Sequence, residues 1–594
     1  MSVVNLLHSV NILMARLVEV KHRGEGGVVD EQGAGLQLDT QLLGPLPIVG
    51  AFCDRLGLPT LLESYLPAED ARLKLAPATA IGVVVRNLVL HRQPVYALGE
   101  WAAPFDPDLL GLAPGEPEML NDDRVARALA RLFDADRASL LTRLVLDAIS
   151  RFGIDTSQLH NDSTSIKLSG AYLDADGHPR GGKPTAKIAR GHSKDFRPDL
   201  KQLVWILTVS ADGAVPLAYR VADGNTEDST THIDTWNHLV ALVGTTTFMY
   251  VADCKLATGE NMRHIDSHHG RFCTVLPASR AEDTQFRDWV ITHQPDWTEA
   301  ARRPGRRLTD PDQMWWTTPA PWPSAEGYRI VWIRSSTKIG YDAEARRDRI
   351  ARGIAALDDL NQRLASPKTR IKTTVAVEAA ATDALVRIGA TRWITTTVET
   401  LTSERFRQEK RGRPGPGTRY RRITSSHHRI AFTINENQVA HDAASDGMFP
   451  LVSNDTDLSD AELLAAYKWQ PNLEKRHAQL KGTQLVAPMF LHDPARIEGL
   501  LCCHFIAMLI QALIERQIRH AMAERGLRQL SLYPEDRGCA APTTARVLGI
   551  FTGLARHHLT DQDGQHLKTF QPQLSGLQNL VLDLLDIPRS AYTG

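Results

Sequence analysis

Three acidic residues, far apart in the chain, have the type and the local setting of metal-binding carboxylates. Asp162 lies in LHNDSTSIKLSG, where a strand that begins near Gln158 would place it within a sheet. Asp253 ends the apolar run FMYVAD, and open α/β sheets present their ligands at the ends of strands. Glu474 lies in a helical segment after the last predicted strand, MFPLVSND at 448–455.

Such a set of acids has a defined chemistry if the fold brings them together. Three carboxylates within a few ångströms raise each other's pKa by repulsion unless a cation neutralises them. Two divalent ions roughly 3.5–4 Å apart do so in two-metal sites, where one activates a nucleophile and the other stabilises the leaving oxygen. Oxygen ligands favour Mg²⁺ or Mn²⁺ over zinc. We therefore predict a site for two Mg²⁺ or Mn²⁺ ions at Asp162, Asp253 and Glu474.

Each acid also has a purely structural interpretation. The chain contains 69 Asp and Glu residues, so two Asp and one Glu are not a signal by themselves, and the first acid could cap a turn in NDST. Glu474 shares a predicted helix face with Tyr467, Gln470 and Lys481, at successive spacings of 3, 4 and 7 residues. A salt-bridge face would not require the Tyr and the Lys, but Pro471 predicts a bend or a break in this helix.

Basic residues gather in two other segments. The first lies between Asp162 and the next predicted strand, and contains Lys183, Lys187, Arg190, His192, Lys194 and Arg197. These side chains could hold phosphates beside the acids, or they could form a solvated loop. The second segment, 404–430, has nine Lys or Arg against two Glu, around a core RGRPGPGTRYRR that we predict to be flexible. It could bind DNA or be a disordered linker.

The elements that must position the acids alternate in a defined order. Apolar, β-branched runs predict strands at 200–210, 215–222, 248–253 and 271–276, and amphipathic spacing predicts helices at 229–244 and 258–269. This is the order of a ribonuclease H-like sheet. In such a sheet the three acids converge on one place.

The rest of the chain is arranged around this sheet. We predict an α/β protein whose ribonuclease H-like catalytic domain is interrupted by an α+β insertion and flanked by helical N- and C-terminal regions. The predicted boundaries are a loose leader (1–44), a helical domain suited to binding DNA ends (45–150), the catalytic domain in two parts (151–279 and 446–490), the insertion (280–445) and a helical region (491–594). The insertion carries tryptophans at 289, 297, 315, 316 and 322, of which Trp315 and Trp316 are expected to belong to its core, although a stacked flipped base is an alternative for these two.

Composition excludes several classes of protein. Net charge is −1, so any DNA-binding surface must come from local segregation of charge. The six cysteines form no CxxC pair, which argues against a zinc finger and indicates a reduced, cytoplasmic protein; binding to DNA would place it with the nucleoid. The most apolar run, 500–514, is too short to span a bilayer and predicts a buried core helix. No nucleotide-binding P-loop motif is present.

The chain resembles a known family at these same positions. Tyr467-x2-Gln470-x3-Glu474-x6-Lys481 is similar to the Y-x2-R-x3-E-x6-K motif of insertion-sequence transposases of the IS-four superfamily. The stretch GHSKDFRPDLKQLVWILTVSADGAVPLAYRVADGNTED, at 191–228, resembles the IS-sixteen-thirty-four-like branch of that superfamily. The resemblance extends over nearly the whole chain. Gln470 stands where the family has Arg and is counted with it among the DNA-binding positions, and Lys468, Lys475 or Arg476 could take over the phosphate contact of that Arg.

The resemblance implies a function. A DDE transposase binds the terminal inverted repeats of its element, cleaves a phosphodiester with Mg²⁺ or Mn²⁺ and transfers the freed strand to a target, usually as a homodimer in a synaptic complex. Tyr467 and Lys481 resemble residues that contact the phosphates of the element end. Two alternatives are a ribonuclease H-fold nuclease without strand transfer and a repurposed DNA-binding protein without catalysis. No membrane partner is expected.

Overall fold

The protein divides into two compact units. A computed structural model describes residues 37–67, 74–90, 93–305, 307, 309–366, 368–561, 563 and 565–594. The first unit is formed by the described residues up to Arg271 together with 468–594, and the second unit is 272–467. Most of the predicted leader, 1–44, lies outside the described residues.

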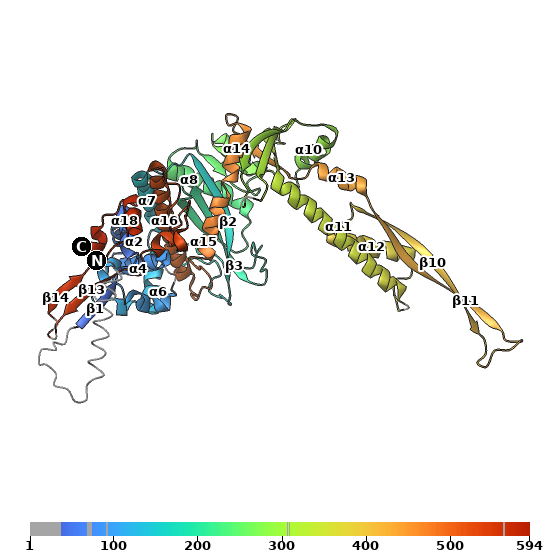
Figure 1. Ribbon diagram of the computed structural model, residues 1–594, viewed down its shortest axis with the longest axis horizontal. Coiled ribbons are helices and arrows are strands. Elements are labelled where there is room, and N and C mark those ends of the chain that lie inside the picture. The colour runs from blue at the N-terminus through green and yellow to red at the C-terminus, as the bar shows by residue number, and fades with distance from the viewer. Residues whose placement is uncertain are drawn as a thin grey trace. The chain divides into compact units, whose positions relative to one another are not determined.

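The first unit begins with a group of helices (Figure 1, blue). These are α2 (Leu46–Arg55), α3 (Leu58–Tyr65), α4 (Pro77–Leu90), α5 (Leu98–Ala102), α6 (Asp122–Asp134) and α7 (Arg137–Phe152), with short 3-10 helices at Val95–Ala97, Pro107–Leu110 and Pro117–Met119. Asn121 caps α6 by accepting a hydrogen bond from the Arg124 backbone N–H. The apolar stripe Val125, Leu129 and Leu132 of α6 is fully buried. The segment 45–150 is therefore helical, as its apolar spacing predicts.

Helix α16 (Pro494–Glu524) forms the centre of this unit and packs against α4, α6 and strand β4. It is the one helix in the described part of the chain that is long and apolar enough to cross a membrane, and its apolar window is entirely buried inside the protein. This confirms the predicted core helix at 500–514. Contact with α6 is so close that a Cβ on Gly499 would lie 2.3 Å from the Leu129 carbonyl oxygen. The helices that follow are α17 (Thr544–Gly549), α18 (Gly576–Leu584) and α19 (Ser590–Thr593), with a 3-10 turn at Pro534–Asp536.

Four strands of the first unit carry two of the predicted acids. They are β2 (Gln158–Leu168), β3 (Lys201–Ser210), β4 (Pro216–Ala222) and β5 (Met249–Val251), in the order β4-β3-β2-β5. Strand β2 is antiparallel to β3 and parallel to β5. A 3-10 turn (Asp228–Thr231) leads into helix α8 (His232–Val243), and helix α9 (Gly259–Ser267) follows β5. The predicted strands at 200–210, 215–222 and 248–253 and both predicted helices are confirmed, each within a few residues.

A second sheet in the first unit was not predicted. Strand β1 (Gln37–Leu42) pairs with β13 (Ala555–Thr560), which pairs with β14 (His566–Phe570), all antiparallel. The predicted helical region 491–594 is mostly helical but also contains the strands β13 and β14, which were not predicted. These strands lack apolar runs because they are only partly buried, so their sequences carry little alternation.

The second unit combines a sheet with long helices. Its strands β6 (Arg271–Val275), β12 (Met448–Ser453), β9 (Arg329–Ser335), β8 (Gln313–Pro319) and β7 (Thr298–Arg303) are neighbours in that order. Its helices are α10 (Ala281–Thr292), α11 (Ser336–Ala365), α12 (Thr374–Ile388), α13 (Glu436–Ala444) and α14 (Asp460–Lys468). Strand β6, before residue 280, pairs with β12, after residue 445. The second unit therefore extends beyond the predicted insertion, 280–445, on both sides. Trp315 is buried, as expected for a core residue.

The basic segment of the second unit is a β-hairpin. Strands β10 (Ile394–Gln408) and β11 (Tyr420–Ile434) pair along their full lengths, and only 409–419 forms the turn. The predicted flexible core, RGRPGPGTRYRR, is therefore ordered at its Tyr420 end. Figure 1 shows the pair as a twisted ribbon beside α11 and α12.

Candidate active site

The parallel pairing of β2 and β5 brings two of the predicted acids together. Gln158 pairs with Met249 and His160 pairs with Val251, an offset that continues to Asp162 and Asp253. Asp162 lies on β2, and Asp253 follows the end of β5. Burial and the nearby charge of Asp162 raise the pKa of Asp253. Asp162 and Asp253, which are 91 residues apart in the sequence, thus interact directly through their charges.

Lys194 provides a positive charge between the acids. Its Nζ lies 2.9 Å from Asp228 Oδ2 and 3.7 Å from Asp162 Oδ1, and it donates to the Ser163 carbonyl oxygen at 2.7 Å. Ser163 Oγ donates to Asp228 Oδ1 at 2.6 Å. Although burial favours neutral Lys194, the charges of Asp162 and Asp228 outweigh it and raise the pKa of Lys194. Lys194 is therefore a charged member of the site.

The segment that carries Lys194 is held by two close backbone approaches. Ala189 forms a two-way backbone bridge with Gln202 of β3. A Cβ on Gly191 would lie 2.0 Å from the Gly224 carbonyl oxygen, and a Cβ on Gly224 would lie 2.0 Å from the Gln202 carbonyl oxygen. Only glycine permits this packing. These contacts fix the loop between β2 and β3 in front of the acids.

Helix α15 (Pro471–Lys481) packs against β2 and carries Glu474. Gln470, which precedes it, accepts from His160 Nδ1 through Oε1 at 2.7 Å and donates to the Asn161 carbonyl oxygen at 3.1 Å. His477 Nε2 lies 3.5 Å from Asp162 Oδ2. Glu474 is exposed and precedes His477 by three residues, so the two share one face of α15. Helix α15 thus brings His477 to Asp162, and Glu474 lies about one turn earlier on the same helix.

Asp162 is ionised in this setting. Burial opposes its charge, but the hydrogen bond and charge of His477, together with Lys194, outweigh burial and lower the pKa of Asp162. Among the described residues, no three His, Cys, Asp or Glu side chains are grouped as a ready metal site. Asp162 and Asp253 offer oxygen donors that suit Mg²⁺ or Mn²⁺, and Glu474 can add a third from α15. These donor atoms are of the kind that Mg²⁺ or Mn²⁺ prefers, and Asp162 and Asp253 are the two that interact with each other here.

Two of the residues predicted to contact DNA are buried instead. Gln470 is used to seat α15 on β2, as described above. Arg476 is only 4% exposed, donates to the Gly213 and Ala214 carbonyl oxygens and lies 2.9 Å from Glu515 Oε2. Both predictions of phosphate contact are therefore wrong, because burial withholds the side chains from DNA.

The other predicted contacts have varied positions. Tyr467 lies on α14, which is separate from α15 because the helix is interrupted before Pro471. Lys481 Nζ donates to both carboxylate oxygens of Asp195 at 2.9 Å, and Lys183 donates to carbonyl oxygens at the end of α6. The exposed cations that remain are Lys187, Arg190, His192, Arg197 and Lys475, of which Arg197 pairs with Asp199. The single predicted face through Tyr467 is therefore absent, while Lys481 lies at the other end of α15 from Glu474.

Sequence reasoning missed two side chains of this site. Asp228 was overlooked because it follows β4 in a loop, where an acid has no periodic signal. His477 could have been found, since it lies three residues after Glu474 on the same helix.

Comparison with known proteins gives limited information. Residues 38–146, which span the N-terminal helices, match the model of a domain of unknown function, DUF4277. No curated protein matches the chain. A piggyBac transposase, solved in a synaptic complex with hairpin DNA, is a weak structural match with a TM-score of 0.36 and 6% identity, over 87% of this chain and 82% of that one. The function is therefore inferred from the geometry of the acids.

Proposed function

We propose that the protein is a DDE transposase that binds the ends of a mobile element, cleaves DNA with Mg²⁺ or Mn²⁺ and transfers the freed strand to a target. In this proposal the first unit contains a ribonuclease H-like catalytic domain of the insertion-sequence type. Asp162, Asp253 and Glu474 are its acids. The partner is duplex DNA, and two copies act together because two ends must be joined in one event.

The observation that supports the proposal most is the parallel register of β2 and β5. Asp162 and Asp253 each lie two residues beyond the last pair, His160 and Val251, and His477 Nε2 on α15 lies 3.5 Å from Asp162 Oδ2. A stable core does not require two half-buried acids that repel each other, since the repulsion between them costs free energy. Carboxyl groups whose pKa values are shifted by burial and by a neighbouring like charge are often found at catalytic sites.

Each group would have a distinct task. Asp162 and Asp253 would hold the ions, and Glu474 would complete the ligand set from α15. The ions would activate the attacking oxygen and stabilise the leaving one. Lys194 neutralises Asp162 and Asp228 and is placed to contact a phosphate at the same position. The exposed Lys187 and Arg190 lie in the same segment and would hold the flanking DNA backbone.

The test is a cleavage and joining assay with the full chain, Mg²⁺ or Mn²⁺ and duplexes that carry the genomic sequence flanking the coding region. Glu474→Gln should abolish cleavage, by a factor of about 10³ or more, and leave DNA binding unchanged. Glu524→Gln removes an exposed acid at the end of α16 and should have no effect.

The same assay distinguishes the alternatives. A nuclease would release products and never join paired ends to a target. A DNA-binding protein without catalysis would bind and cleave nothing. Cleavage that persists in Glu474→Gln would show that this residue is not part of the site.

A further inference from the structure

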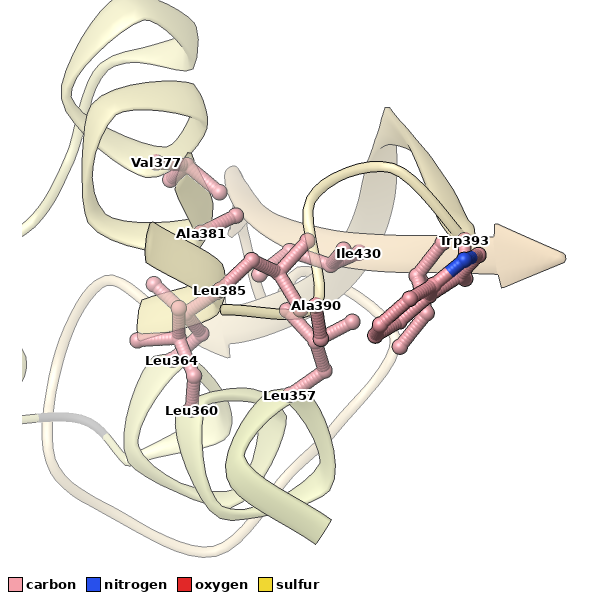
Figure 2. Packing of buried hydrophobic residues seen from close by; sticks show 10 residues of the cluster. Leu357, Leu360, Leu364, Val377, Ala381, Leu385, Ala390, Trp393 and Ile430 are labelled. Carbon is pink, nitrogen blue, oxygen red and sulfur yellow. The ribbon is translucent and has the colours of Figure 1, made fainter. Parts of the chain in front are cut away.

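The outer part of the β10–β11 hairpin (394–434), residues 401–427, has no hydrogen bond or ion pair with another element in the described part of the chain; the last such bond toward the tip joins His428 to the Lys372 carbonyl oxygen. At its base, Ile394 and Ile430 are buried in a cluster with residues of α11 and α12 (Figure 2). From Glu399 to Arg407, by contrast, every residue of β10 is exposed, including Phe406 at 65%. At roughly 3.3 Å a residue, the exposed part is about 30 Å long.

The base of this hairpin is firmly anchored. The side-chain amide of Asn361 on α11 donates to the Ile430 carbonyl oxygen and accepts from the Ile430 N–H, at 2.9 and 2.8 Å. The Leu357, Leu360 and Leu385 side chains pack below it, as Figure 2 shows. An isolated two-stranded ribbon is marginally stable in water, so this anchoring gives the outer part a fixed direction.

The hairpin carries a strong excess of positive charge. Residues 394–434 include nine Lys or Arg and three Glu. Register places Arg407 directly opposite Arg421, and Arg405 lies two residues away on the same face. Arg422, on the opposite face, pairs with Glu404. Like charges directly across a strand pair destabilise it. The three arginines therefore form an uncompensated cationic face, here called the arginine face.

A polyanion of regular shape is the partner that fits this face. The major groove of B-form DNA is about 12 Å wide and admits a two-stranded ribbon, while A-form RNA has a deep, narrow groove that does not. Arginine pairs with phosphate in a bidentate geometry. On the other face, exposed Phe406 and Tyr420 lie near the tip and can contact the thymine methyl groups or sugars of a groove.

We propose that the β10–β11 hairpin is a DNA-binding arm that enters the major groove of a duplex and contacts its phosphates through Arg405, Arg407 and Arg421. Its choice of DNA over another polyanion rests in part on the proposed function. The arm is separate from the acids in sequence and belongs to the other compact unit. It contributes affinity and position, not sequence readout, because its cations contact phosphate.

The test measures binding of the full chain to a 40-base-pair duplex of mixed sequence over a range of salt concentrations. The triple variant Arg405→Gln, Arg407→Gln, Arg421→Gln should lose about three units of the slope of log K against log salt. Its affinity at about 0.1 M salt should fall about a hundredfold. The control removes three exposed arginines of α11, by Arg347→Gln, Arg352→Gln and Arg363→Gln, and should keep both values.

Two further measurements keep the outcome clear. Replacing the same three arginines with Lys retains charge and should restore most of the slope, and thermal unfolding of the Gln variant should be no lower than that of the wild type. Equal losses in the arm and α11 variants would overturn the proposal. So would equal competition by duplex RNA, single-stranded DNA or polyglutamate, which would identify a general polyanion surface.

Failure of this proposal can be told from failure of the proposed function. Asp162→Asn should keep the full salt slope and lose cleavage. If the wild type cleaves DNA and the triple Gln variant of the arm keeps the wild-type affinity and salt slope, the arm proposal alone is refuted. A wild type that binds through the arm and never cleaves would refute the catalytic assignment alone.

Discussion

Removing the charge of Lys194 should expose the repulsion among the acids. At an effective dielectric constant of 20, attractions over 2.9 Å to Asp228 and 3.7 Å to Asp162 are about 6 and 4 kcal/mol before desolvation and ordering. Loss of one partner of a buried pair costs about 3–5 kcal/mol. Because the Lys194 side chain is 31% exposed, we expect Lys194→Met to lose about 2–3 kcal/mol of unfolding free energy at neutral pH.

The loss should depend on pH and on divalent ions. Without Lys194, the repulsion from Asp162 that already raises the pKa of Asp253 is no longer offset by this cation, so the folded pKa of Asp253 rises further above the unfolded one. Such a group binds its proton more tightly when folded, and the variant should regain stability as pH falls from 7.5 to 5. Mg²⁺ at about 10 mM should stabilise the variant more than the wild type, by mass action.

Urea unfolding at both pH values, with and without Mg²⁺, measures these effects. Lys187→Met is the matched control, since Lys187 lies in the same segment with an exposed side chain. If Lys194→Met loses no more than this control, or if its deficit is the same at pH 5 and pH 7.5, the electrostatic account of the site is refuted.

Two further predictions concern the supports of the site. Gly224→Ala should lower the free energy of unfolding by about 1–3 kcal/mol and reduce cleavage, because its Cβ would collide with the Gln202 carbonyl oxygen. Gly50→Ala is the control, since there is open space around Gly50. Equal stability of the two variants in urea would contradict the packing described for Gly224. Burial lowers the pKa of His160 to about 4. A folded pKa below the unfolded value of about 6.5 means that stability is lost as pH falls between them, by about 2 kcal/mol from pH 7.5 to pH 5. His160→Gln should show a smaller loss over that range, and an unchanged loss would assign it to other groups.

The sequence predicted those elements whose burial follows a simple period. Strands β3, β4 and β12 are apolar because other parts of the protein cover one or both of their faces. Helix α16 is apolar all round because the protein encloses it. Strand β11 was missed for the opposite reason. Most of its side chains are exposed on both faces, so no alternation marks it, and its arginines resemble those of a flexible segment.

The candidate site was predictable only in part. Asp253 is marked by the strand before it, and Asp162 by its place in a strand that the Thr and Ser residues favour. Arg476 was misjudged because the group that neutralises it, Glu515, is supplied by α16, and such long-range pairing leaves no trace at either position. Gln470 was misjudged likewise, because its partner His160 lies 310 residues earlier.

The place of α16 in the chain has a consequence for synthesis. Helices α4 and α6 pack on a helix that ends at Glu524, so the ribosome must add roughly 370 residues after Phe152 before they can be covered. At about 5–20 residues a second, that interval is on the order of 20–70 s. During it the nascent helices present apolar surface, which makes them clients for chaperones. A message truncated before this point yields a product that cannot close this core.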